Sequence, residues 1–313
     1  MALPSTTVSS PDRLNETSRR RLWLAAIKPP MYSVAVIPIT VGTAVAYGVT
    51  QTFHAGIFSL FFGAAIAIIA WLNLSNDVFD ADTGIDKNKA HSVVNLTGNQ
   101  RLVFWVSNGF LLLGLLSILD ICWEQRDPMV VILMVLACAL GYSYQGPPFR
   151  LGYQGLGEII CFVTFGPLAI AAVYYSQTQT FSAGILGASI LIGLNTSVIL
   201  FCSHFHQIED DLAAGKRSPL VRLGTLTGAK VLTISVFSFY GLALALIALG
   251  QMPSQTGLIA LSLPLAWQLV NYVQQYHDQP LPISRCKFLA VNWHFGSGLL
   301  LAIAYVWSGR VAS

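Results

Sequence analysis

Long apolar runs alternate with short polar stretches along almost the whole chain. About 20 apolar residues are needed for an α-helix to cross the hydrocarbon core of a bilayer. Nine runs approach or exceed this length, so the pattern predicts nine membrane-spanning helices. Their approximate limits are 28–49, 55–76, 102–120, 128–145, 156–175, 183–205, 229–249, 256–273 and 288–308.

The segment before the first run is polar and contains Asp12, Glu16 and three consecutive arginines from Arg19 to Arg21. It lacks the apolar stretch of a secretory signal. We therefore interpret residues 1–27 as a cytoplasmic tail and residues 28–313 as one transmembrane domain. No further soluble domain is expected.

Composition supports an all-α, polytopic membrane protein. Hydrophobic residues make up 54% of the chain and charged residues only 10%, whereas a soluble domain carries about 25% charge. The mean hydropathy is +0.63. The net charge of +3 gives no reason to expect a nucleic-acid partner. The five cysteines form no CxxC pair, so neither disulfides nor a zinc site are expected.

The basic residues test the count of nine helices. With nine spans, all but two of the 17 Lys and Arg residues fall on the side of the N-terminus, the exceptions being Arg126 and Arg310. Basic residues concentrate in cytoplasmic loops, and one span more or fewer would destroy this asymmetry. We therefore expect a cytoplasmic N-terminus in a plasma or thylakoid membrane. The nine helices would form two four-helix halves around a central cavity, with one helix in addition.

Half of the chain's 14 acidic residues lie in two short stretches, 73–86 and 207–216, which follow the second and sixth runs. On a helix, Asn76 and Asp80 would share one face because they are four residues apart, and Asp82 would lie off that face. The acidic residues of the two stretches are Asp77, Asp80, Asp82, Asp86, Glu209, Asp210 and Asp211.

Carboxylates gathered beside a membrane need a counter-charge. Ligand sets made only of oxygen suit Mg²⁺, which commonly bridges carboxylates to substrate phosphates. The pattern therefore predicts a site for a diphosphate whose apolar tail lies among the helices. Cations on the same side that could neutralise the diphosphate include Lys28, Arg150, Lys216 and Arg217.

Other interpretations of these residues stay open. Single loop carboxylates are often solvated helix caps. His204 and His206 could bind a metal together, but carboxylates dominate here and we favour hydrogen-bonding roles. Tyr142, Tyr144 and Tyr153 could pack or anchor the protein at the membrane interface. Their ring faces could also shield a carbocation.

Two other classes of protein could carry intramembrane acids. A transporter of divalent cations or lipids would place them near the bilayer midplane, on broken helices. Here both stretches lie at the ends of predicted spans and continue into polar loops. A protein that only binds lipid would not need the acids at all.

Four segments of the chain resemble motifs of a known protein family. NDVFDADTGID (76–86) resembles the first Asp-rich motif of the UbiA-type superfamily of intramembrane aromatic prenyltransferases, and DDLAAGKRSPLVRLG (210–224) resembles the second. KPPMYSVAVIPITVGTA (28–44) is similar to the family's opening helix. YSYQGPPFRLGYQGLGEIICFVTFGPL (142–168) is similar to the MenA-like, naphthoate branch. The resemblance covers nearly the whole chain.

The motifs also depart from the common pattern of the superfamily. Gly84 stands where many members have an Asp, and Asp86 follows two residues later, as is usual in the naphthoate branch. Gln207 replaces a usual Asp of the second motif, and Asp210 is its possible substitute. The form SHFHQIEDD (203–211) is similar to phylloquinone-type members, which use a phytyl donor.

The resemblance implies roles for individual residues. Mg²⁺ would be held by Asp80 and Asp211, with Asp77, Asp86 and Asp210 as further candidates and Asn76 as an orienting group. The four cations named above would bind the diphosphate. Residues that would contact the ring or the tail are Asn73, Tyr142, Tyr144, Tyr153, His206 and Gln207.

The resemblance further implies the reaction. Ionisation of a prenyl diphosphate would give an allylic cation, a dihydroxynaphthoate or carboxynaphthoquinone ring would attack it, and CO₂ would leave. A phytyl donor is expected first and a longer polyprenyl donor next. Homogentisate, 4-hydroxybenzoate or chlorophyllide are the alternative acceptors. Oligomeric state is left open.

Overall fold

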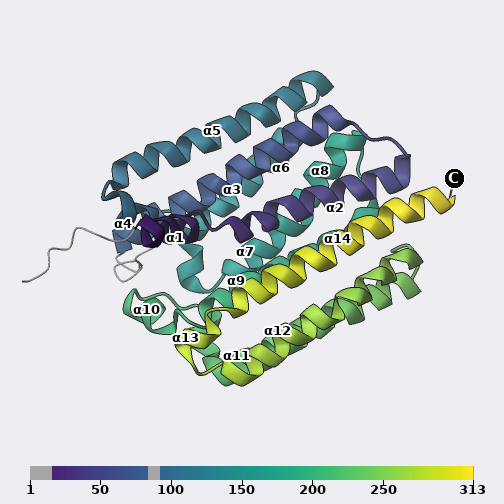
Figure 1. Cartoon of the computed structure of the whole chain (residues 1–313). Helices are drawn as coiled ribbons and strands as arrows, with labels where there is room; N and C mark the ends of the chain where they lie inside the picture. The colour runs from purple at the N-terminus through teal and green to yellow at the C-terminus, as the bar shows by residue number, and fades with distance from the viewer. Residues whose placement is uncertain (1–15, 84–91, 313) are drawn as a thin grey trace, which may run out of the picture.

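The computed structural model describes residues 16–83 and 92–312, and within them it contains helices and no strands. The long helices lie side by side in an elongated bundle (Figure 1). Eight helical segments of the described chain are long and apolar enough to cross a membrane. The structure therefore confirms an all-α, polytopic membrane protein.

The described helices overlap each of the predicted runs, although eight segments rather than nine are long and apolar enough to cross a membrane. The helix α6 has 17 residues and is shorter than the other membrane-crossing candidates. The elements are α2 (Ser33–Thr50), α3 (Ala55–Thr83), α5 (Gln100–Gln125), α6 (Met129–Gln145), α7 (Gly157–Val163), η3 (Thr164–Leu168), α8 (Ala169–Thr178), α9 (Leu186–His204), α11 (Pro219–Ala248), η5 (Ser254–Ser262), α12 (Leu263–Tyr276) and α14 (Cys286–Ala312).

Short helices gather at one end of the bundle, opposite the C-terminus (Figure 1). They are α1 (Glu16–Ile27), α4 (Val93–Thr97), α10 (Ile208–Ala213) and α13 (Pro280–Ile283). We call this end the acid end, because α3 finishes there and both acidic stretches belong to it. The opposite end is called the far end.

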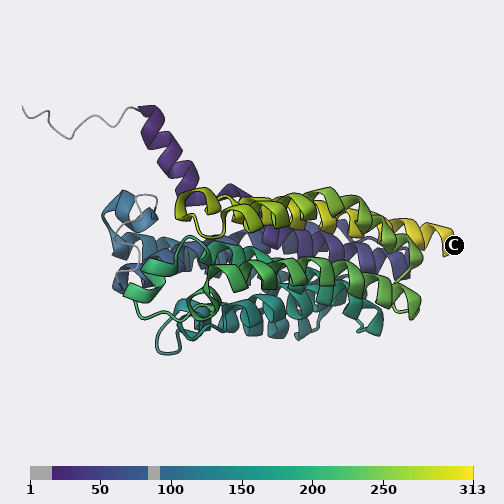
Figure 2. The same cartoon turned by 90° about the horizontal axis from the view of Figure 1, so that it is seen from below.

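The helix α1 projects away from the bundle at the acid end (Figure 2). The sequence analysis treated residues 1–27 as a tail and predicted no helix there. Part of this segment, from Glu16 to Ile27, is helical. Ala26 on α1 is buried against Val78, Val93 and Val94, which fixes the end of the helix to α3 and α4.

Glycines bring α7 and α9 into close contact in the second half of the chain. At Gly193 of α9, an added Cβ would lie only 2.7 Å from the carbonyl oxygen of Phe162. A Cβ added at Gly166, in the π-helical turn η3, would lie even closer to the carbonyl oxygen of Ser189 on α9. Small residues allow such close approach of membrane helices. The contact places Glu158 of α7 next to His204 of α9.

A narrow apolar cavity of about 50 Å³ lies between α2, α3, α6 and η3. Ile39, Phe61, Cys138 and Phe165 contribute to its lining, and Leu72 marks its approach to the acid end. Leu72 stands one helical turn before Asn76. The cavity therefore starts just beneath the first acidic stretch.

Candidate active site

The first acidic stretch forms the last turns of α3, which continues to Thr83 and thus beyond the apolar run that predicted it. The helical spacing between Asn76 and Asp80 is therefore present, and both residues are half-buried. Asp86 lies outside the described residues. Asp82 is exposed, and one of its oxygens accepts a hydrogen bond from Gln100 (2.7 Å).

Asp77 links three segments of the acid end. Its side chain is 1% exposed, and Oδ1 lies 3.2 Å from Nζ of Lys28. Its Oδ2 accepts a hydrogen bond from the backbone N–H of Val93 (2.9 Å). The sequence analysis assigned Asp77 to a metal and Lys28 to a diphosphate, but the structure pairs the two residues with each other. Asp77 thereby fixes α3 to the segment between α1 and α2 and to α4.

Asp80 faces a buried amide from α6. Nε2 of Gln145 donates a hydrogen bond to Oδ1 of Asp80, and Gln145 is only 4% exposed. The remaining amide oxygen of Gln145 accepts no hydrogen bond from the described residues. Asp80 and Gln145 therefore place carboxylate and amide oxygens together at the end of α3.

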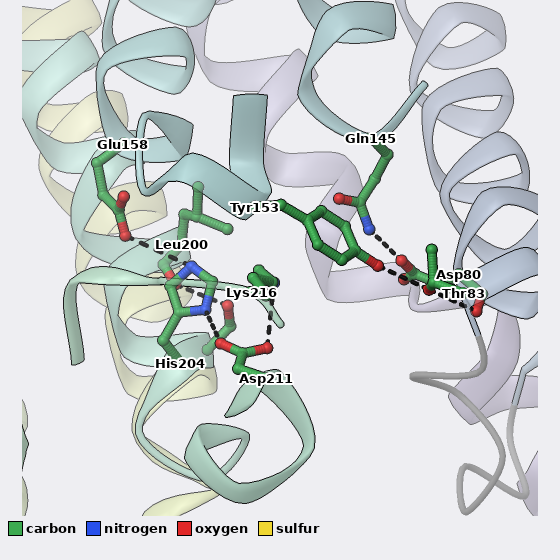
Figure 3. A network of polar contacts seen from close by, with 10 residues as sticks. Asp80, Thr83, Gln145, Tyr153, Glu158, Leu200, His204, Asp211 and Lys216 are labelled. Atoms are coloured by element: carbon green, nitrogen blue, oxygen red, sulfur yellow. Dashed lines mark hydrogen bonds and ion pairs between the residues drawn. The ribbon is translucent and has the colours of Figure 1, made fainter. Parts of the chain in front are cut away.

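The second acidic stretch is built around Asp211, which is fully buried on α10. Nζ of Lys216 lies 3.3 Å from its Oδ1, and Nδ1 of His204 lies 3.2 Å from its Oδ2. On the other side of the imidazole, Nε2 of His204 lies 3.5 Å from Oε1 of Glu158. Figure 3 shows the resulting row of Lys216, Asp211, His204 and Glu158.

The partners of Asp211 determine its ionisation. Burial acts to raise the pKa of this carboxyl group, but the hydrogen bond with His204 and the charge of Lys216 together outweigh it. The pKa of Asp211 is therefore held below its ordinary value. A buried carboxylate of this kind stays charged at neutral pH because a cation and a hydrogen bond favour its ionised form.

Tyr153 connects the two acidic stretches. Its hydroxyl group is hydrogen-bonded to Oγ1 of Thr83 (2.7 Å) at the end of α3. Its ring lies beneath both Arg150 and Lys216, with Cζ and Nζ each 5.9 Å from the ring centroid. Its carbonyl oxygen accepts a hydrogen bond from the backbone N–H of Arg217 (2.8 Å). Figure 3 shows Tyr153 between the two groups of acids.

Tyr153 belongs to the one-turn 3-10 helix η2 (Leu151–Gln154), which follows α6. Burial is the main factor that raises the pKa of its phenol to about 12. The hydroxyl group is therefore protonated at neutral pH and can act as a hydrogen-bond donor.

Some predicted residues lie apart from these contacts. Asp210 is exposed on α10, although the adjacent Asp211 is buried. Gln207 precedes α10, and its carbonyl oxygen accepts the backbone N–H of Asp211 (2.8 Å). The hydroxyl group of Tyr142 donates to the carbonyl oxygen of Pro147 (2.9 Å), so this ring is held on the loop after α6.

Other predicted residues have polar atoms turned into the protein. Nδ2 of Asn73 and Nε of Arg150 are buried and have no hydrogen-bond partner among the described residues. Tyr144 packs its ring against Gly152 and Gly157. His206 is half-buried at the end of α9. The two unpartnered nitrogens, Nδ2 of Asn73 and Nε of Arg150, can donate to a polar ligand at the acid end.

Sequence reasoning missed Gln145 and Glu158 as members of the site, and it left His204 without a partner. The spacing of seven residues between His204 and Asp211 was a signal for their pairing. A short turn joins α9 to α10 and brings Asp211 back to the imidazole of His204. Glu158 lies 46 positions before His204, and no local pattern connects the two. The motif GLGE, which ends at Glu158, was noted only as part of the resemblance.

The oxygen-rich donor set fits Mg²⁺ better than a softer metal. Within the described residues, no group of three His, Cys, Asp or Glu side chains converges to enclose a metal. The amide oxygen of Gln145 and both carboxylate oxygens of Glu158 are buried without a hydrogen-bond partner among the described residues. Asp80 adds a carboxylate beside Gln145. Mg²⁺ uses few protein carboxylates and completes its coordination with water and substrate phosphates. The arrangement fits such a shared site.

Comparisons with known proteins point in the same direction. The model of the UbiA prenyltransferase family matches residues 35–296. The chain is 62% identical over 290 residues to a 2-carboxy-1,4-naphthoquinone phytyltransferase of Synechocystis sp., covering 93% of this chain and 94% of the relative. It is 42% identical over 299 residues to the chloroplastic 2-carboxy-1,4-naphthoquinone phytyltransferase of Arabidopsis thaliana, covering 93% of this chain and 78% of the relative.

Solved structures share the fold. One of them is a UbiA homolog from Archaeoglobus fulgidus bound to DMAPP and Mg²⁺, with a TM-score of 0.54 and 15% sequence identity. The match covers 88% of this chain and 98% of that chain. At this level of identity the likeness concerns the fold alone.

Proposed function

This chain belongs to the UbiA prenyltransferase family, and from this premise we propose that it transfers a phytyl group from a diphosphate donor to a carboxylated naphthoquinone-type ring. Diphosphate and CO₂ are the other products. The observation that carries the proposal is the 62% identity to the phytyltransferase of Synechocystis sp. over 93% of the chain. The reaction belongs to phylloquinone synthesis.

The acid end supplies the groups that this chemistry needs. Asp80 with Gln145 and Asp211 with Lys216 approach the same region from two sides, and Tyr153 joins them. Asp80 and Asp211 would hold Mg²⁺. When bound, Mg²⁺ adds positive charge that stabilises the diphosphate as it leaves.

The cations of this chain act on the same leaving group. Lys216 and Arg150 lie over the ring of Tyr153 and would bind the diphosphate oxygens. Such fixed charges lower the barrier because they stabilise the negative charge that develops in the transition state. Lys28 would contribute only by exchanging Asp77 for the diphosphate, since the two are paired.

The narrow cavity beneath Asn76 marks where the first carbons of the donor's tail would enter, since about 50 Å³ is too small for the whole tail. Its lining is almost wholly apolar, with Phe61, Leu72 and Phe165 among the residues that form it. Apolar walls exclude water from a cation formed at the acid end. The allylic carbon would then be attacked by the ring carbon that bears the carboxyl group, and loss of CO₂ would restore the ring.

We further propose that α6 is the ninth membrane span. Its 17 residues give a length of about 26 Å, close to the hydrocarbon thickness of about 30 Å. It begins beside Asp127, which bonds to Tyr175 at the far end (2.7 Å), and it ends with Gln145 beside Asp80 at the acid end. This supports nine spans. We propose that they form two four-helix halves, with the acid end and the N-terminus on the cytoplasmic side, where basic residues concentrate. The host membrane would be plasma or thylakoid.

A product assay tests the function. Membranes containing this protein would be supplied with carboxynaphthoquinone or dihydroxynaphthoate and with phytyl diphosphate, in Mg²⁺ or in EDTA. In Mg²⁺ only, we expect a decarboxylated, phytylated naphthoquinone from carboxynaphthoquinone and the corresponding naphthoquinol from dihydroxynaphthoate. Product formed solely with a longer prenyl diphosphate would contradict the phytyl donor. Product formed solely with homogentisate, 4-hydroxybenzoate or chlorophyllide would contradict the naphthoate acceptor.

A further inference from the structure

The helix α12 carries its polar side chains on the outside of the bundle. Gln268, Asn271 and Gln275 are all exposed, and their spacings of three and four residues place them on one face. The opposite face of the helix is buried against the bundle. Its buried residues are Ala266, Leu269, Val270 and Val273.

This outward stripe of carboxamides is unusual for a helix that meets lipid. The helix α5, at another edge of the bundle in Figure 1, shows the expected pattern. Every exposed side chain between Leu102 and Leu119 on α5 is apolar, apart from the glycine at 109. In hydrocarbon, a carboxamide without a hydrogen-bond partner is costly. The outer face of α12 therefore requires a polar partner.

Contacts with α11 show how deep the stripe extends. Nε2 of Gln274 donates hydrogen bonds to Oγ1 of Thr233 (2.8 Å) and to the carbonyl oxygen of Ala229, beside the exposed Lys230. A lysine at this position marks the membrane interface. Gln268 comes six residues before Gln274 on α12, which places it about 9 Å further from this end of the helix and deeper in the membrane. At least part of the stripe thus lies at the depth of the lipid tails.

We propose that this face of α12 binds the same face of a second copy of the chain. A carboxamide is both a donor and an acceptor of hydrogen bonds, so a stripe of carboxamides is complementary to itself. A two-fold axis brings each residue of such a patch to its own equivalent. The stripe carries no charge, which gives no reason to expect a charged partner.

The spacing also fits the geometry of a helix pair. Steps of three and four residues are the seam of a left-handed pair of helices, and most bundles of membrane helices pack with this hand. A two-fold axis along the membrane normal would make the two α12 helices parallel. Both acid ends would then face the same side of the membrane.

Neighbouring residues extend the patch. Trp267, which is 58% exposed, contacts Phe237 of α11 edge to face, with ring centroids 6.4 Å apart. Asn292 of α14 is exposed as well. Gly296 of α14 faces Leu265 of α12, and the two helices are antiparallel, so Asn292 lies level with Leu269. The interface would therefore contain a central carboxamide seam with an aromatic side chain on one edge.

Cysteine cross-linking tests the proposal in the membrane. Asn271→Cys would be oxidised in native membranes with copper phenanthroline, beside the wild type and Leu112→Cys. Leu112 is exposed on the apolar face of α5 and serves as the matched control. We expect a band at twice the chain mass for Asn271→Cys alone. No such band, a band equal to that of Leu112→Cys, or cross-linking to a different protein would overturn the proposal.

A second variant tests whether the carboxamides themselves hold the copies together. In Gln268→Leu/Asn271→Leu/Gln275→Leu the seam becomes apolar, which suits a lipid environment and preserves the helix. We expect at least a tenfold weaker association of labelled copies in liposomes, measured by energy transfer on dilution with lipid. Prenyl transfer by the variant would show that it is folded. An unchanged association, or a wild type that is monomeric in liposomes, would contradict the proposal.

Discussion

Asp80 and Asp211 both lie at the acid end, but their surroundings differ. Asp80 is half-buried near the end of a long helix, where it accepts a hydrogen bond from the neutral amide of Gln145. Asp211 is fully buried on a two-turn helix, and it lies between Lys216 and His204. The first carboxylate is therefore partly exposed at the acid end, whereas the second is enclosed and its charge is balanced within the protein.

The two acidic stretches look alike in sequence, but this difference shows that a carboxylate in them can serve two tasks, namely stabilising the fold and binding a metal. In a low-dielectric interior, an ion pair with a full set of partners holds its geometry firmly, but removal of one partner leaves a costly charge. Asp211 therefore contributes to the stability of the fold in addition to any role in binding the metal. In the first stretch, it is Asp77 that stabilises the fold in this way, because it is paired with Lys28.

The largest effect is expected from Asp80→Asn. The variant keeps an oxygen for the amide of Gln145, so folding should be preserved, but it loses the charge that would hold Mg²⁺. We expect product formation to fall at least ~100-fold, as for the loss of one strong electrostatic group in an active site. The measurement is the initial rate of prenyl transfer in membranes at saturating Mg²⁺.

Asp82→Asn is the matched control for Asp80→Asn. Asp82 lies on the same helix but is exposed and bonded to Gln100. We expect its rate to stay within about twofold of the wild type, because exposed polar contacts contribute little. Equal losses in both variants would show that the first stretch acts only through its total charge.

An intermediate effect is expected from the buried pair. Asp211→Asn leaves Lys216 buried without its carboxylate, and removing one partner of such a pair costs about 3–5 kcal/mol. We expect a lower unfolding temperature in detergent together with loss of activity. In Asp211→Asn/Lys216→Met the unfolding temperature should recover while activity stays low. Recovery of both would mean that Asp211 has only a structural role.

The smallest effect is expected from pH. Because the pKa of Asp211 is below its ordinary value in the folded protein, its contribution to stability is present above the unfolded pKa of about 3.9. It is lost as the pH falls through the folded pKa. The difference in unfolding temperature between wild type and Asp211→Asn should therefore stay constant from pH 7 to about pH 5. A difference that already vanishes in this range would contradict the assigned ion pair.

The sequence predicted much of the fold because membrane helices follow from long apolar runs. The run 55–76 lies within α3, which continues to Thr83, and the run 229–249 matches α11 except for its last residue. The helix α11 begins earlier, at Pro219, although its backbone is not helical at Gly224 (φ 73°). Polar residues at a helix end do not interrupt the backbone hydrogen bonds, so hydropathy underestimates such helices. The family assignment also followed from sequence, and the family model confirms it.

The partners within the site were harder to predict. Lys28 and Asp77 are 49 positions apart, and only packing between α3 and the segment that joins α1 to α2 brings them together. Glu158 approaches His204 because Gly166 and Gly193 let α7 and α9 touch. Hydropathy and spacing describe one helix at a time. They do not state which faces of two helices meet.

The length of α3 has a consequence for how the donor arrives. With 29 residues, α3 is about 44 Å long, whereas the hydrocarbon core is about 30 Å thick. Its last turns, with Asp80, thus extend to the level of the lipid headgroups. A prenyl diphosphate has the build of a lipid and already carries its phosphates at that level. It can reach the site by lateral diffusion within one leaflet, so its density per membrane area, rather than its concentration in water, sets the rate of encounter.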